Sequence, residues 1–111
     1  MLLLLSLLGI LCASDPTGPV KWRFAASATG DGYVRIDLRT EVEGGWHIYA
    51  TELPSDEGPI ATAIRFKASE AFVLEGGLVE PEPVEQYDPN FAMMVRYHSG
   101  SPAFVQRIKP L

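Results

Sequence analysis

From residue 33 to residue 42 the side chains alternate strictly between two kinds. One set suits a buried surface and comprises Val34, Ile36, Leu38, Thr40 and Val42. The residues between them are charged or aromatic. A period of two places the two sets on opposite faces of a β-strand, whereas a helix needs an apolar period near 3.6 residues. The segment therefore predicts a strand with one face in a core and the other in water.

Shorter alternations recur along the chain between turns rich in glycine and proline. They predict strands at residues 20–24, 46–50, 63–67, 91–97 and 103–108. Two further strand segments flank Gly76-Gly77, either as a tight hairpin or as one bulged strand. Residues 81–89, with three prolines and three acidic residues, are expected to form an exposed crossing loop. About seven short strands separated by turns predict an all-β chain folded as an antiparallel β-sandwich.

Aromatic side chains on these strands have core packing as their ordinary role. We expect that role for Trp22, Phe24, Trp46, Phe66, Phe91, Tyr97 and Phe104. Of the neighbours Met93 and Met94, we expect one to be buried and one to lie at the surface, because adjacent strand residues face opposite ways. The aromatic content is thus accounted for by the core, without a binding role.

Residues 1–14, MLLLLSLLGILCAS, form an uncharged apolar run that ends in small residues. The run is shorter than the roughly 20 apolar residues that a membrane-spanning helix needs, and it is typical of a secretory signal. No Lys or Arg precedes it, which departs from the usual signal. We expect residues 1–14 to be a signal peptide that directs export. The alternatives are a lipid-anchored Cys12 and a buried amino-terminal strand or helix.

Charge and cysteine content exclude several classes of function. The chain has 9 Lys and Arg against 14 Asp and Glu, a formal net charge of −5. Nucleic-acid binding and attraction to anionic lipid both rest on basic surfaces, so we expect neither partner and no basic face. The single cysteine, Cys12, excludes an intramolecular disulfide, a CxxC redox centre and a cysteine zinc site within this chain.

Few residues are candidates for chemistry. The two histidines, His47 and His98, fall opposite the expected core face, so we expect both to be solvated. Two groups of loop carboxylates are also expected to be solvated: Glu52, Asp56 and Glu57, and Glu80, Glu82, Glu85 and Asp88. We therefore assign no catalytic, cofactor-binding or metal-binding residue and no cofactor. A hydrolase that uses His47 or His98 is a further alternative.

Ordered sequence segments carry a family resemblance. They are VKW at residues 20–22, GWHIYA at 45–50, GPIATAIRF at 58–66, PNF and VRY within 89–97, and FVQRI at 104–108. Together they resemble the amino-terminal domain of the thiol:disulfide interchange protein DsbD, the disulfide bond corrector domain family. The resemblance covers about residues 19–109, and the segments at 45–50 and 58–66 are the most specific.

The resemblance implies an immunoglobulin-like sandwich over residues 19–111 that is exported to the periplasm. It also implies that the domain takes reducing equivalents from a thioredoxin-like domain and passes them to periplasmic thiol proteins by thiol–disulfide exchange. In the family, the cysteine pair lies on strands after the segment that residues 104–108 match. No residue of this chain matches that pair, which leaves the enzymatic activity of this polypeptide open.

Two explanations account for the missing cysteines. We expect the chain to be a piece of a longer protein whose last strands carry them, because the sequence ends directly after a strand and leaves a sheet edge unpaired. The alternative is a redox-inert extracytoplasmic module with the same fold, which binds another protein through strand pairing or through its loops.

Overall fold

The computed structural model describes residues 18–111, and these are all-β, with seven strands and no helix. The strands are β1 (Val20–Ala28), β2 (Val34–Val42), β3 (Ile48–Tyr49), β4 (Phe72–Val79), β5 (Val84–Asp88), β6 (Met93–His98) and β7 (Ala103–Pro110). They form two antiparallel sheets, one in the order β1-β2-β7-β4 and one in the order β3-β6-β5. The prediction of an all-β antiparallel chain is confirmed, and the arrangement is consistent with a β-sandwich. The expected signal peptide at residues 1–14, with Cys12, lies outside the described residues.

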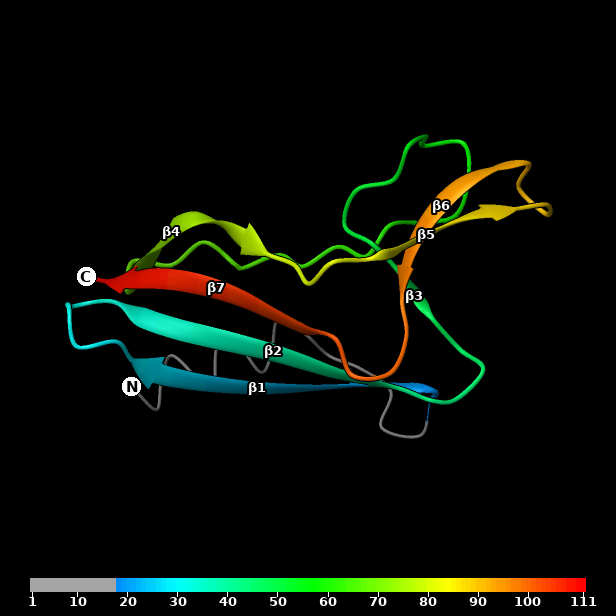
Figure 1. The fold of residues 1–111 in the computed structure, drawn as a ribbon. Helices are drawn as coiled ribbons and strands as arrows, with labels where there is room; N and C mark the ends of the chain where they lie inside the picture. The colour runs from blue at the N-terminus through cyan, green and yellow to red at the C-terminus, as the bar shows by residue number, and fades with distance from the viewer. Residues whose placement is uncertain (1–17) are drawn as a thin grey trace.

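The two sheets are placed at an angle rather than stacked along their whole length. Figure 1 shows the four-stranded sheet along the length of the molecule and the three-stranded sheet rising from one end of it. The chain passes between the sheets after β2, β3, β4 and β6. Several crossings therefore meet where the sheets join, and side chains at this junction come from segments far apart in the sequence.

The inner face of the four-stranded sheet forms the core. All five inward residues of β2 are buried, as its alternation predicts. Three of them join a cluster of buried side chains made by Val34, Ile36, Leu38, Phe72, Phe104 and Ile108. Burying a large apolar side chain stabilises a fold by roughly 1.5–3 kcal/mol, so this cluster supplies the main driving force for folding. Trp22 and Phe24 of β1 pack against it as expected.

The strand expected at residues 63–67 is absent, because residues 61–69 belong to no sheet ladder. Ile64 and Phe66 nevertheless pack against the core cluster. The segment runs beside β4 and β7 as an extended cover over the four-stranded sheet (Figure 1). Its alternation therefore reports burial of one side of an extended chain, which does not require a hydrogen-bonded neighbour.

Around Gly76-Gly77 the chain forms one bulged strand, the second of the two expected forms. The register of β4 against β7 shifts between Glu75 and Val79. Gly76 has a φ of 71°, a conformation that side-chain-bearing residues adopt only under strain. The prediction of a loop at residues 81–89 is partly wrong, because β5 forms within these residues and pairs with β6. Prolines flank β5 without entering it, which leaves its amide groups free for the ladder.

The carboxyl-terminal strand does not leave an unpaired edge. β7 lies inside the four-stranded sheet, paired with β2 on one side and β4 on the other. Phe104, Gln106 and Ile108 share its buried face, as predicted. The Gln106 amide Nε2 donates to the carbonyl oxygens of Gly76 at 3.1 Å and Arg107 at 2.9 Å. The Gln106 side chain thereby supplies a hydrogen-bond donor to a backbone carbonyl group at the bulge in β4, where the ladder with β7 is interrupted.

Two of the expected core aromatics are at the surface, and a third, Tyr97, lines a surface cavity instead of packing in the core cluster. Trp46 is 57% exposed and Phe91 is 43% exposed. Trp46 follows Gly45, whose φ of 85° reverses the chain as it leaves β2, and it precedes β3. Phe91 lies in the turn between β5 and β6. Both residues continue an alternating pattern past the end of the strand, so the pattern alone placed them in the core wrongly.

Candidate functional site

Three aromatic rings gather on the three-stranded sheet. Tyr49 and Tyr97 are direct partners across the β3–β6 ladder. The His47 ring, just before β3, lies 5.0 Å from the Tyr49 ring and 4.9 Å from the Tyr97 ring, measured between ring centroids. His47 is exposed, as the sequence predicts. Its contact with two tyrosines is a consequence of β3 pairing with β6, which sequence spacing does not reveal.

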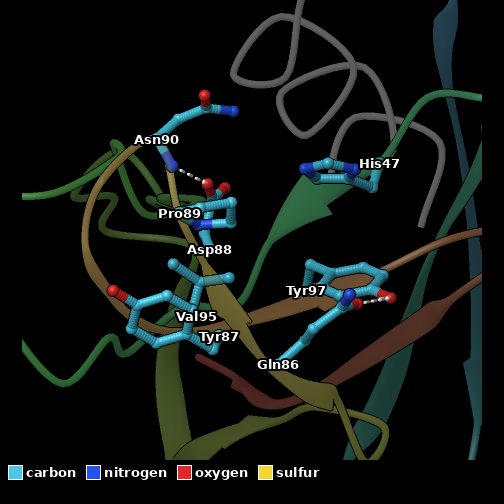
Figure 2. A pocket seen from close by; sticks show the side chains of 8 residues that line it. All are labelled: His47, Gln86, Tyr87, Asp88, Pro89, Asn90, Val95 and Tyr97. Atoms are coloured by element: carbon cyan, nitrogen blue, oxygen red, sulfur yellow. Dashed lines mark hydrogen bonds between the residues drawn. The ribbon is translucent and has the colours of Figure 1, made fainter.

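The His47 and Tyr97 rings border a surface cavity of about 310 Å³. Its lining residues are His47, Gln86, Tyr87, Asp88, Pro89, Asn90, Val95 and Tyr97 (Figure 2). Two hydrogen bonds organise the polar part of the lining. The Tyr97 hydroxyl donates to Gln86 Oε1 at 2.9 Å, and the backbone N–H of Asn90 donates to Asp88 Oδ1 at 2.8 Å. The cavity thus combines fixed ring faces with a carboxylate.

Negative charge dominates this end of the molecule. The exposed carboxylates near the three-stranded sheet are Glu52, Asp56, Glu57, Glu82 and Glu85, and these are solvated as expected. Arg96 on β6 offsets part of this charge, with its Nε 4.0 Å from Glu85 Oε1. Burial and the negative charge of Asp88 both raise the pKa of Tyr49, so its phenol stays protonated at neutral pH.

A second polar group joins the two sheets, and it corrects two expectations. His98 is only 4% exposed, and its Nε2 lies 2.7 Å from Glu80 Oε2. The amide N–H of Thr51 donates to Glu80 Oε2 at 3.0 Å, and the Thr51 hydroxyl donates to Glu80 Oε1 at 2.7 Å. The edge of the His98 ring also packs on Phe104 at 5.5 Å. The prediction that His98 and Glu80 are solvated is therefore wrong for both residues.

The three residues of this group sit at three chain crossings. Thr51 follows β3, Glu80 follows β4, and His98 ends β6, so the group fastens the junction of the sheets. Burial by itself raises the pKa of Glu80, but hydrogen bonds from His98 and Thr51 outweigh it and the pKa lies below its ordinary value. No motif spacing relates these residues. Only the crossing of strands brings them together.

The group formed by Glu80, Thr51 and His98 supports the junction of the sheets, because its polar atoms are paired with one another. The Thr51 hydroxyl donates its hydrogen bond to Glu80 Oε1. Within residues 18–111 no three His, Cys, Asp or Glu side chains are grouped so that they could hold a metal ion. The cavity beside Tyr97 is consequently the best candidate for a functional site in the described chain.

No helix within residues 18–111 is long and apolar enough to cross a membrane. Comparisons of the chain with protein-family models, with curated proteins and with solved structures find no match. The resemblance to the disulfide bond corrector domains stays a prediction from the sequence segments at residues 20–22, 45–50, 58–66, 89–97 and 104–108.

Proposed function

We propose that this chain is the protein-binding amino-terminal domain of a thiol:disulfide interchange protein of the disulfide bond corrector type. In this proposal residues 1–14 direct export to the periplasm, and residues 19–111 form the domain. Its partners are a thioredoxin-like domain and periplasmic thiol proteins. The observation that carries the proposal is the cavity beside Tyr97 on an acidic, aromatic-rich sheet. The family resemblance supplies the class of partner.

The strand arrangement partly supports an immunoglobulin-like assignment. Constant-type immunoglobulin domains divide seven strands into sheets of four and three, with strands 1-2-5-4 in one and 3-6-7 in the other. This chain has the same division and shares the neighbours 1-2 and 3-6. It departs from that pattern because β5 and β7 have exchanged places.

Recognition, rather than exchange, is the role we assign to residues 18–111. Thiol–disulfide exchange needs an attacking thiolate and a second cysteine that resolves the mixed disulfide. The chain has one cysteine, Cys12, within the proposed signal peptide. In a relay, the exchange step then depends on cysteines that these residues do not supply, and the domain positions the partner.

The chemistry of the cavity favours a basic side chain of the partner. A Lys or Arg head group is attracted to the face of an aromatic ring within about 6 Å, and more strongly when water is excluded. Tyr87 and Tyr97 offer such faces, and Asp88 offers a carboxylate for the positive charge. The surrounding carboxylates would speed the approach of a basic surface, because complementary charge raises association rates.

Exposed apolar side chains next to the cavity provide the remaining contact area. Tyr87 is 55% exposed, and Val84, Phe91 and Met94 are also exposed. Aromatic residues and methionine are enriched at protein interfaces. β5 is an edge strand of its sheet, so a partner strand can also add to it by backbone hydrogen bonds.

Affinity capture from periplasmic extract tests this proposal. The intact chain serves as bait beside an Asp88→Asn/Tyr97→Ala variant and a control, Glu70→Gln/Ile60→Ala, at two exposed positions outside the cavity. We expect the bait to retain a thioredoxin-like or thiol protein, the cavity variant to lose it, and the control to keep it. Equal retention by all three baits contradicts the assignment of the cavity.

The second candidate is a redox-inert extracytoplasmic binding module, which the lack of cysteine in residues 18–111 favours. The same capture separates the two functions. A partner that contains a reactive cysteine pair supports a place in a thiol relay. A partner without cysteines, retained equally with and without reductant, supports the redox-inert module.

A further inference from the structure

The outer face of the four-stranded sheet gathers most of the cations of this acidic chain. They alternate with the buried residues of three neighbouring strands and comprise Lys21 and Arg23 on β1, Arg35 and Arg39 on β2, and Arg107 and Lys109 on β7. These are six of the nine Lys and Arg residues of the protein. The expectation of no basic face is therefore wrong, because strand alternation concentrates on one face cations that the composition averages over the chain.

The register of the sheet sets like charges side by side. Arg23 is the direct partner of Arg39, and Arg35 is the direct partner of Arg107. Like charges directly opposite on one face of an antiparallel pair destabilise the sheet. An external anion bound between the paired arginines would relieve this repulsion.

Internal carboxylates neutralise this face only in part. Arg23 lies 3.6 Å from Glu41, Arg35 lies 3.0 Å from Asp37, and Arg107 lies 3.0 Å from Asp31. The pairs of Arg23 and Arg107 are exposed on both sides, whereas Asp37 is half-buried, and exposed ion pairs contribute little to stability. No described carboxylate lies within 4.0 Å of the cationic groups of Lys21, Arg39 or Lys109. Positive charge therefore remains available to a partner.

The Arg107 side chain is held in place on this face. Its guanidinium lies 4.7 Å over the Tyr33 ring while it also pairs with Asp31 in the turn between β1 and β2. Hydrogen bonds from Thr29 and Arg107 lower the pKa of Asp31 to about 2. The carboxylate is thus ionised throughout the physiological range, and Arg107 keeps a fixed orientation beside Arg35.

We propose that the outer face of β1, β2 and β7 is a docking surface for an extended, acidic segment of a partner protein. Successive side chains on one face of a strand are about 6.6 Å apart, and neighbouring strands are about 4.8 Å apart. Alternate carboxylates of an extended chain have the same spacing as these cations. Arg guanidinium groups pair with carboxylates through two parallel hydrogen bonds, which adds specificity to the attraction.

A protein segment fits this face better than a nucleic acid or a lipid surface. Asp37, Glu41 and Glu75 lie on the same face as the cations. A uniform polyanion meets these carboxylates as well and is repelled by them. A protein segment can place its own neutral or basic residues opposite them, because interface charges are arranged in complementary patterns. This surface lies on the other sheet from the cavity, so it adds a second partner to the proposed function.

Fluorescence anisotropy with a labelled peptide in which glutamate alternates with serine tests the proposal on the intact chain. The test variant is Arg35→Ser/Arg39→Ser, and the matched control is Arg65→Ser/Lys67→Ser, which removes two cations from the segment at residues 61–69. We expect the test variant to weaken binding about tenfold and the control to change it less than about twofold. Raising the salt to about 0.15 M should weaken binding to the parent chain, because screening acts on exposed charges.

Several outcomes overturn the proposal. One is the absence of peptide binding at low salt, and another is equal weakening by the two variants. Tighter binding to phosphatidylglycerol vesicles or to single-stranded DNA than to the peptide would assign the face to a lipid or a nucleic acid instead. Circular dichroism confirms that both variants are folded, which is expected because all four substituted side chains are exposed.

Discussion

Glu80 is an example of how a charged side chain is accommodated at a partly buried position. A carboxylate that leaves water is stable only when hydrogen bonds replace its hydration. The backbone and hydroxyl of Thr51, together with His98, supply these bonds to Glu80. Each bond joins segments from different crossings, so the satisfaction of one side chain also sets the positions of the two sheets.

At the scale of the residue, we predict that Glu80→Gln lowers the free energy of unfolding by about 1.5–3 kcal/mol, because hydrogen bonds to a charged group are lost. Urea denaturation at neutral pH measures the loss. The matched control Glu82→Gln, at an exposed loop position, should stay within about 0.5 kcal/mol of the parent. An equal effect of the two substitutions would show that Glu80 does not fasten the junction.

The Glu80→Gln variant also tests how the free energy of unfolding depends on pH. The folded-state pKa of Glu80 lies below its ordinary value of 4.5, so the unfolded chain binds its proton first as the pH falls. The stabilisation is complete above about pH 4.5 and is lost as the pH falls through the folded-state pKa. The Glu80→Gln chain should lack this part of the acid-induced loss.

At the scale of the element, alternation identified β2 and β7 correctly and failed for residues 63–67. Both kinds of segment bury alternate side chains, but only β2 and β7 lie where another strand presents free amide and carbonyl groups. For β5 the prediction failed in the opposite way, because a strand forms where a loop was expected. Its flanking prolines suggested a loop, although the five residues between them pair fully with β6.

The bulge in β4 gives a prediction at this scale. Gly76→Ala should lower the free energy of unfolding by about 1–2 kcal/mol, because Cβ strains a residue at positive φ. The adjacent control, Gly77→Ala, has no atoms within 4 Å of the added Cβ and no positive φ, so it should be neutral or stabilising. Thermal or urea denaturation compares them. Equal losses would mean that the bulge tolerates side chains at neither position.

At the scale of the whole molecule, the two sheets differ in how much they bury. The inner face of β2 is fully buried, whereas four of the five residues of β5 are exposed. Local opening takes less free energy where few apolar contacts hold a segment. The stable part of the molecule is therefore the four-stranded sheet, and the cavity beside Tyr97 lies on the less stable part.

Amide hydrogen exchange measures this difference. We predict that the hydrogen-bonded amides of β2 and β7 exchange only through global unfolding, while those of β5 exchange faster through local opening. In the Glu80→Gln variant the β5 amides should lose protection more than the β2 amides, because the junction is weakened. Uniform protection of both sheets would mean that they unfold as one unit.

The sequence by itself determined the all-β class, the buried face of β2 and β7 and the exposure of His47. Each of these depends on neighbours within one strand, where a period of two has a direct physical meaning. The tertiary structure alone decided the burial of His98 and Glu80, the cavity beside Tyr97 and the alignment of cations across β1, β2 and β7. These depend on which strands pair and in what register, and pairing is set by the free energy of the whole assembly rather than by any one segment.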